Sequence, residues 1–96
     1  MPAIDLVIHT PARLRIMSAL SALPPRAQID FRSLGRSLDL TDGNLGAHLQ
    51  TLEETGYIKA EKKFVDRKPR TYVAATAKGR IHFDEHVAAL REICRV

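Results

Sequence analysis

Apolar residues recur at helical spacing near the start of the chain. Thr10 is suited to capping free backbone amides, and Pro11 suits the first position of a helix. Pro24-Pro25 marks the end, because proline disfavours helix in the residue before it. Residues 4–9 are mostly apolar and are expected to form an extra turn that packs on another element or on a partner. The helical face consists of Leu14, Met17 and Leu20, widened by Ile16 and Leu23.

Two further helices follow in quick succession. Asp30 begins one and Thr41 begins the next, since both side chains accept hydrogen bonds from a first helical turn. Only Asp39-Leu40 separates them, and Gly56 ends the third helix in a left-handed conformation. The apolar stripes are Phe31, Leu34 and Leu38 in the second helix, and Leu45, Leu49 and Leu52 in the third.

The pattern then changes from helical to strand-like. Residues 57–65 are rich in strand formers, residues 66–69 indicate a turn, and residues 70–75 predict a returning strand. Thr76 is expected to cap a final helix that runs to about Arg95. Its apolar stripe has the spacing of a helix–helix seam and consists of Phe83, Val87, Leu90 and Cys94.

The order helix, helix, helix, hairpin, helix predicts an α+β, mainly helical, winged helix-turn-helix fold. We expect one domain over residues 1–96, with a winged helix core at 11–75. Residues 1–10 are expected to be an N-terminal dimer-contact segment, and residues 76–96 an additional C-terminal dimerisation helix. The tight join between the second and third helices is typical of the helix-turn-helix, whose second helix enters the DNA major groove.

The outward face of the third helix is small and polar. Asn44 is able to make a bidentate pair with adenine, and the Ala47 methyl to contact thymine. His48 and Thr51 are expected to reach base edges or phosphates. A merely solvated helix face is the alternative interpretation. The predicted DNA-binding residues of this helix are Thr41, Asp42, Gly43, Asn44, Ala47, His48 and Thr51.

The hairpin carries a concentration of positive charge. Six cations against two acids give it the net charge of the whole chain, +4. Phosphate binding requires such charge, and it releases counterions from DNA. Arg67 or Lys68 at the tip is expected to enter the minor groove, whereas lysines that protect a sheet edge are the alternative. The predicted wing contacts are Lys62, Lys63, Arg67, Lys68 and Arg70.

Composition narrows the class of protein further. The chain has 96 residues, one cysteine and an ordinary 45% of hydrophobic residues, so it is long enough for one core. A single cysteine excludes a disulfide within the chain and fits a reducing cytoplasm. No apolar run approaches the ~20 residues of a membrane span, and the first residues do not resemble a signal peptide. We therefore expect a cytoplasmic protein without membrane association.

Several segments together resemble the short, stand-alone winged helix regulators related to the MarR and ArsR families. They are residues 11–17, 31–34, 40–49, 52–58, 70–72 and 76–80, and they span nearly the whole chain. The resemblance implies a homodimeric transcription factor, usually a repressor, that binds double-stranded DNA without a cofactor. Gly46 departs from the pattern, because these regulators often have serine there. The implied dimer contacts from both terminal regions are Leu6, Val7, Phe83, Val87, Leu90 and Cys94.

Three other hypotheses stay open. The first is a winged helix that binds protein instead of DNA. The second is a metal-responsive, ArsR-like repressor, because His82 and His86 lie one helical turn apart, although a proper zinc site needs about four ligands. The third is redox sensing at Cys94, near Arg91 and Arg95. No catalytic motif is present, so we expect no enzyme, and an unknown small-molecule effector would need a cleft in the dimer.

Overall fold

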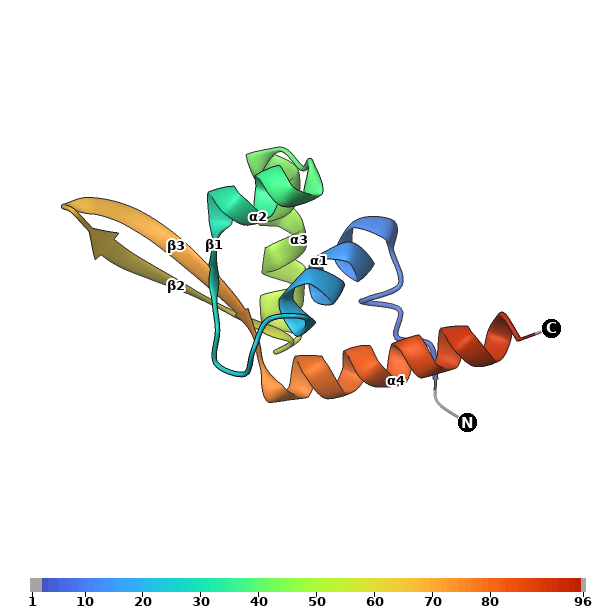
Figure 1. Cartoon of the computed structure of the whole chain (residues 1–96). Helices are drawn as coiled ribbons and strands as arrows, with labels where there is room; N and C mark the ends of the chain where they lie inside the picture. Colours follow the sequence, from blue (N-terminus) through green and yellow to red (C-terminus); the bar gives the residue numbers. More distant parts are fainter. Residues whose placement is uncertain (1–2, 96) are drawn as a thin grey trace.

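The computed structural model describes residues 3–95 of the chain. Three helices gather in the middle of the molecule, a two-stranded hairpin extends to one side, and the last helix extends to the other (Figure 1). The molecule is accordingly elongated, with principal extents of 53 × 25 × 21 Å. In chain order the elements are α1 (Pro11–Ser21), β1 (Ile29–Asp30), α2 (Phe31–Leu38), α3 (Asp42–Glu54), β2 (Ile58–Val65), β3 (Lys68–Ala75) and α4 (Ala77–Ile93). The predicted winged helix-turn-helix is confirmed.

Every helix begins at the capping residue that the sequence predicts. Thr10, Asp30, Thr41 and Thr76 all have extended backbone, and each side chain accepts a hydrogen bond from the backbone N–H three residues further on. These bonds satisfy amides that a helix cannot satisfy for itself. The starting points of all four helices are therefore encoded locally.

The three-helix core forms from the predicted apolar stripes. Ile16, Met17 and Leu20 of α1 are fully buried, as is Leu34 of α2. In α3 the complete stripe is buried, namely Leu45, Leu49 and Leu52. Asp39 ends α2 in the left-handed conformation, with φ of 54°, so α3 begins only three residues later. This short connection sets α3 across α2, which is the helix-turn-helix geometry.

The hairpin is longer and its turn is tighter than the sequence predicts. The strands pair antiparallel from Ile58 opposite Ala75 out to Val65 opposite Lys68. Only Asp66 and Arg67 remain as the turn, so the prediction of a four-residue turn over 66–69 is wrong. Pro69 is tolerated within β3 because the outer part of this strand has a neighbour on one side only.

A short third strand was not predicted. β1 pairs with β3 at Ile29 opposite Val73 and at Asp30 opposite Tyr72, so the strand order is β1-β3-β2. Two residues are too few to show the alternation that identifies a strand in a sequence. The pairing matters for the site, because it holds the start of α2 beside the base of the hairpin.

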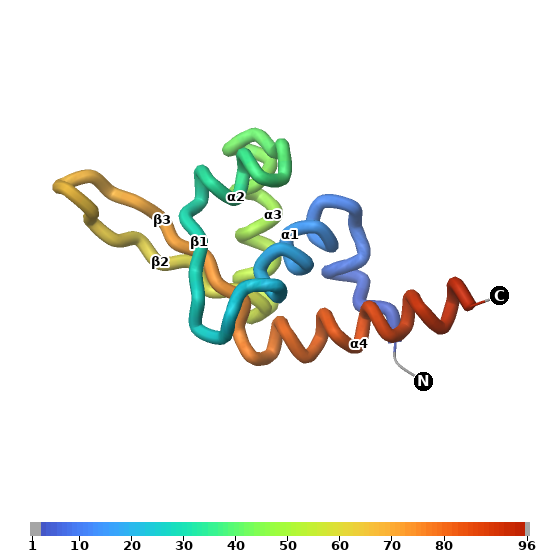
Figure 2. Tube along the Cα trace, viewed as in Figure 1, coloured from blue at the N-terminus to red at the C-terminus, as the bar shows by residue number. Residues whose placement is uncertain are grey.

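The N-terminal segment, residues 3–10, lies alongside α4, as the tube in Figure 2 shows. It forms the predicted turn, closed by a hydrogen bond of 2.8 Å from the His9 amide to the Asp5 carbonyl. Ile8 is fully buried in the common core, so the turn packs on the protein's own helices. Beyond this contact, the C-terminal end of α4 projects past the rest of the molecule (Figure 1).

Candidate nucleic-acid interface

The N-terminal half of α3 presents an exposed surface. Thr41, Asp42, Gly43, Asn44 and Ala47 are all exposed. The side chain of Thr41 accepts a hydrogen bond of 3.2 Å from the Asn44 backbone amide, which fixes the first turn. The side chain of Asn44 therefore extends from an ordered helix end, with small residues on both sides of it. Such a surface allows a helix backbone to approach the base edges of a groove closely.

His48 and Thr51 are less accessible than the sequence suggests. Both are half-buried. The guanidinium of Arg13 in α1 lies 3.2 Å from His48 Nδ1, and since arginine is only a donor, His48 accepts. The Thr51 hydroxyl donates to the Ala47 carbonyl at 3.3 Å. Both side chains thus have partners within the protein.

The hairpin tip has an unusual backbone conformation. Asp66 and Arg67 both have positive φ, of 51° and 64°. A two-residue turn with positive φ at both positions matches the twist of a hairpin, but it favours glycine or asparagine. An arginine in this conformation costs roughly 1 kcal/mol. The fold alone does not favour arginine at the tip, where its charge is fully exposed.

The other predicted wing cations are also exposed. Lys62, Lys63, Lys68 and Arg70 all lie on the surface of the hairpin. Lys63 lies 3.7 Å from the Glu61 carboxylate and 5.5 Å from the centre of the Tyr72 ring. The hairpin therefore keeps most of its positive charge available to a ligand.

A cleft between α2 and β3 adds cations that the sequence analysis missed. Its volume is about 600 Å³, and its charged lining comes from Arg32 and Arg36 on α2 and from Lys68 and Arg70 on β3. Asp30 is the acid of the lining. Hydrogen bonds from Ser33 hold the pKa of the Asp30 carboxyl below its usual value, helped by Arg70 and Arg36. The spacing of Arg32 and Arg36, four residues apart in α2, is the feature of the sequence from which a cationic surface on this helix could have been predicted.

The predicted dimer residues of α4 do not form a single exposed seam. Phe83 is half-buried and packs against the protein's own core. Val87 and Leu90 are half-buried, while Cys94 caps the end of the helix and is exposed. The α4 positions that are buried are instead Gly79, His86 and Ala89. His86 is buried although it is a histidine, because its ring finds polar partners inside the protein.

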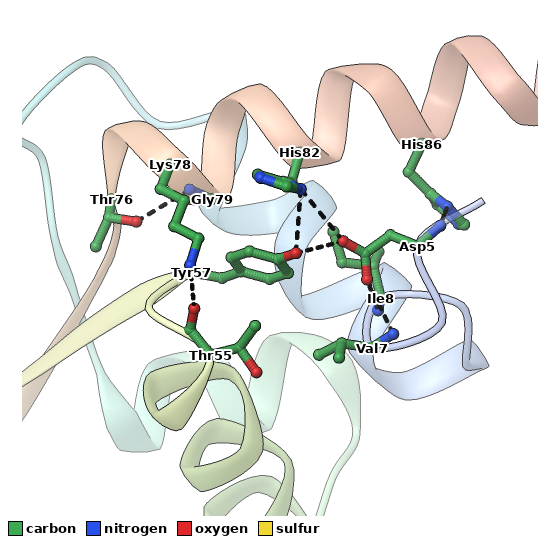
Figure 3. Close-up of polar contacts among 10 residues, drawn as sticks. All are labelled: Asp5, Val7, Ile8, Thr55, Tyr57, Thr76, Lys78, Gly79, His82 and His86. Atoms are coloured by element: carbon green, nitrogen blue, oxygen red, sulfur yellow. Dashed lines mark hydrogen bonds and ion pairs between the residues drawn. The ribbon is translucent and has the colours of Figure 1, made fainter. Parts of the chain in front are cut away.

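A polar cluster connects the N-terminal segment to α4 (Figure 3). The Tyr57 hydroxyl donates to the Asp5 carboxylate, and His82 Nδ1 lies 3.1 Å from the Tyr57 oxygen and 3.5 Å from Asp5 Oδ2. Burial opposes ionisation of Asp5, but hydrogen bonds from Tyr57 and from the Ile8 and Val7 amides outweigh it, and the pKa of Asp5 is lowered. Burial and the Asp5 carboxylate raise the pKa of Tyr57 to about 12.

His82 faces the Tyr57 hydroxyl and the Asp5 carboxylate, whereas His86 faces the Asp5 backbone amide and His9. Across residues 3–95, no group of three or more histidine, cysteine, aspartate or glutamate side chains is arranged to hold a metal ion. In the same part of the chain, no helix is long and apolar enough to cross a membrane.

The fold and the exposed α3 surface define a class of protein, the winged helix transcriptional regulators. The chain superposes on a transcriptional regulator homologue from Pyrococcus horikoshii OT3 with a TM-score of 0.82 and 36% identity, over 91% of this chain and 83% of that one. It superposes on a MarR-family regulator from Enterococcus faecalis V583 with a TM-score of 0.70 and 26% identity, over 92% and 73% of the two chains.

The family follows from the sequence match. A profile of the winged helix DNA-binding domain matches residues 12–94, and the chain belongs to this family. It is also 29% identical, over 89 residues, to an uncharacterized protein of Methanocaldococcus jannaschii, with 93% of this chain and 94% of that protein covered. The resemblance to MarR-like regulators is confirmed. Folds of this kind are typical of binding proteins rather than enzymes.

Proposed function

We propose that the protein is a transcriptional repressor that binds a specific double-stranded DNA site as a homodimer. The observation that carries the proposal is that one protein presents both an exposed first half of α3 and an exposed, cationic hairpin. Two such helices related by a twofold axis would read successive major grooves of a pseudo-palindromic site. No part of this arrangement requires a cofactor.

Base readout is assigned to the first half of α3. Asn44 pairs with an adenine and the Ala47 methyl contacts a thymine, while Thr41, Asp42 and Gly43 fit closely into the groove. His48 and Thr51 take part from the edge of this surface. Their existing hydrogen bonds to Arg13 and Ala47 fix their orientation, which supports a positioning contribution.

Attachment to the DNA backbone is assigned to the hairpin and to the cleft beside it. The major groove read by α3 and the minor groove reached by Arg67 are separated by one sugar-phosphate strand. The cleft between α2 and β3 contains four cations, two from the helix-turn-helix and two from the hairpin. We therefore place phosphates of that strand against Arg32, Arg36, Lys68 and Arg70, with Lys62 and Lys63 further along the hairpin.

Pairing of two copies is assigned to the N-terminal segment and α4. Leu6 is 80% exposed and Ile93 is 61% exposed, so each offers apolar surface to a second copy. Ile93 is spaced seven residues from His86 and continues the core-facing side of α4 past the end of the protein's own core. A second copy would cover this surface together with Val7, Val87, Leu90 and Cys94. Phe83 supports the interface from inside the protomer.

The decisive experiment is selection of bound fragments from the source genome, followed by footprinting of the recovered fragments. We expect a symmetric protected site whose halves are about one helical turn apart. At that site, Asn44→Ala should weaken binding by about 1–3 kcal/mol, with little effect on binding to random DNA. Gln50 offers an exposed side-chain amide further along the same helix as a matched control, and Gln50→Ala should have little effect on either kind of DNA.

Two outcomes would contradict the proposal. Failure to enrich any fragment would contradict sequence-specific binding. Equal effects of Asn44→Ala on binding to specific and to random DNA would contradict the assignment of base readout to Asn44. Fusion of the recovered site to a reporter gene tests the repressor role, since repression predicts higher expression when the protein is absent.

A further inference from the structure

His86 is a fully buried histidine with two polar neighbours. It lies at 0% exposure on α4. Its Nδ1 atom is 3.0 Å from the backbone nitrogen of Asp5 (Figure 3). Its Nε2 atom is 3.3 Å from Nδ1 of His9, and the two rings meet edge to face, with their centres 5.1 Å apart. Both ring nitrogens therefore contact the N-terminal segment.

These contacts determine which nitrogens carry protons. A backbone amide is always a donor, so His86 Nδ1 accepts and has no proton. Neutral imidazole has one N–H, which must then be on Nε2 and donate to His9 Nδ1. His9 Nδ1 is in turn unprotonated. Every hydrogen bond of the pair is satisfied when both rings are neutral.

An additional proton has no favourable place in this arrangement. Protonation of His86 puts an N–H at Nδ1, directly against the N–H of Asp5. Protonation of His9 puts an N–H at Nδ1, directly against the N–H on His86 Nε2. Either event replaces a hydrogen bond with two opposed donors, and it leaves a part-buried donor without an acceptor.

The charged groups around the pair do not remove this conflict. The Asp5 carboxylate already accepts from the Tyr57 hydroxyl and from the amides of Val7 and Ile8. On α4, His82 faces Tyr57 and Asp5, and Glu85 lies near Tyr57. From α1, Arg13 donates to the Val7 carbonyl. Burial and the neighbouring His9 lower the pKa of His86, and the attraction of Asp5 offsets them only in part.

The element held by the pair is the one that presents Leu6. The hydrogen bonds of His86 with the Asp5 amide and with His9 attach the N-terminal segment to α4, in addition to the burial of Ile8 and the hydrogen bonds from Tyr57 to Asp5 and from Arg13 to Val7. Loss of the two contacts with His86 would loosen the part of the segment around Leu6, whereas Ile8 retains its apolar contacts. The surface offered to a second copy would then lose its fixed shape.

We propose that His9 and His86 form a proton-sensitive latch that holds residues 3–10 on α4, and that acidification opens it and weakens DNA binding through the dimer. The coupling to DNA rests on the proposed function. The opening of the latch does not, because it concerns contacts within one chain.

The test measures hydrogen exchange of the Asp5, Val7 and Ile8 amides at pH 7.5 and pH 5, as protection factors that correct for the intrinsic effect of pH. We expect the Asp5 protection to fall in acid, by at most about 30-fold at pH 5, because pH 5 lies about 1.5 units below the ordinary pKa of histidine, 6.5. His86→Asn keeps an acceptor near the Nδ1 position and cannot be protonated. In this variant the protection should be the same at both pH values.

Two further variants keep the test decisive if the buried substitution prevents folding. His9→Asn, on an exposed residue, retains the acceptor for His86 Nε2 and should reduce the response to acid. Gln50→Ala changes an exposed side chain of α3 that is hydrogen-bonded to Glu54, outside the latch, and should leave the response unchanged. An Asp5 protection factor that is the same at both pH values in the unmodified protein would overturn the latch.

DNA binding to the selected site, measured at the same two pH values, separates the two proposals. Weaker binding at pH 5 in the unmodified protein, but not in His86→Asn, supports the coupling. Opening of the latch with unchanged affinity overturns the coupling alone. No specific binding at pH 7.5, together with an intact latch response, would contradict the proposed function and leave the latch standing.

Discussion

Gly79 of α4 lies directly against the backbone carbonyl of Tyr57. A Cβ atom at Gly79 would be 2.0 Å from the carbonyl oxygen, which also accepts a hydrogen bond of 3.0 Å from the Thr76 amide. We expect Gly79→Ala to lower the free energy of unfolding by about 1–3 kcal/mol, because backbone must move to admit the methyl group. Urea denaturation measures the change. Gly43→Ala is the control, since nothing lies within 4 Å of its Cβ position, and it should be neutral or stabilising.

Gly46 has open space where related regulators often have serine. Nothing lies within 4 Å of a Cβ at this position. Gly46→Ala should stabilise α3 by roughly 0.5–1 kcal/mol through helix propensity alone. Gly46→Ser should stabilise it less but bind the selected DNA more tightly, because its hydroxyl can donate to a phosphate. Equal DNA affinities of the serine and alanine variants in a fluorescence anisotropy titration would contradict the phosphate contact.

Arg67 and Arg26 share a left-handed backbone, with φ of 64° and 69°, and differ in location. Arg26 lies in the loop between α1 and β1, and Arg67 at the hairpin tip. Glycine relieves the strain at either position, so both Arg67→Gly and Arg26→Gly should unfold at slightly higher urea concentration. Only Arg67→Gly should weaken DNA binding, and it should do so on all sequences. Similar DNA affinities of the two variants would contradict a contact between Arg67 and DNA.

The cations of the cleft between α2 and β3 predict how DNA affinity depends on salt concentration. Replacement of both Arg32 and Arg36 by glutamine should reduce the slope of log affinity against log salt by about 2, one for each lost phosphate contact. Binding should weaken by a similar factor on specific and random DNA. A matched variant with glutamine at Arg26 and Arg91 removes the same charge elsewhere on the surface. If both double variants give the same slope, the cleft does not hold the backbone.

The raised pKa of Tyr57 predicts that the protein loses stability at alkaline pH. Its pKa of about 12 in the folded protein exceeds the ordinary value of 10.0, so the folded state favours the neutral phenol. The stabilisation is complete below pH 10 and is lost as pH rises from about 10 to about 12. Tyr57→Phe should be less stable than the unmodified protein at pH 7, by about 1.5–3 kcal/mol for a hydrogen bond to a carboxylate.

The difference in free energy of unfolding between Tyr57→Phe and the unmodified protein should then shrink above pH 10. Urea denaturation at pH 7, 9 and 11 measures it. Tyr72→Phe serves as the control, because this variant should retain the alkaline loss. A difference between Tyr57→Phe and the unmodified protein that stays constant from pH 7 to pH 11 would contradict the assignment.

Sequence reasoning was most successful where the determinants are local. Each of the four helix caps acts on an amide three residues away, and the α3 stripe repeats every three or four residues. Contacts between segments that are distant in the sequence could not be predicted. The β1 strand exists through its pairing with β3, and Arg32 and Arg36 become part of a cleft because that pairing places α2 beside the hairpin.

The sequence by itself determined the helix starts, the core stripes, the hairpin and the concentration of charge on it, because hydrogen bonding and burial within one element depend on nearby residues. Only the tertiary structure decided the role of His86. A fully buried histidine is costly unless its two nitrogens find partners. Those partners, Asp5 and His9, come from the opposite end of the chain, more than 75 residues away, and no local pattern reports such a distance.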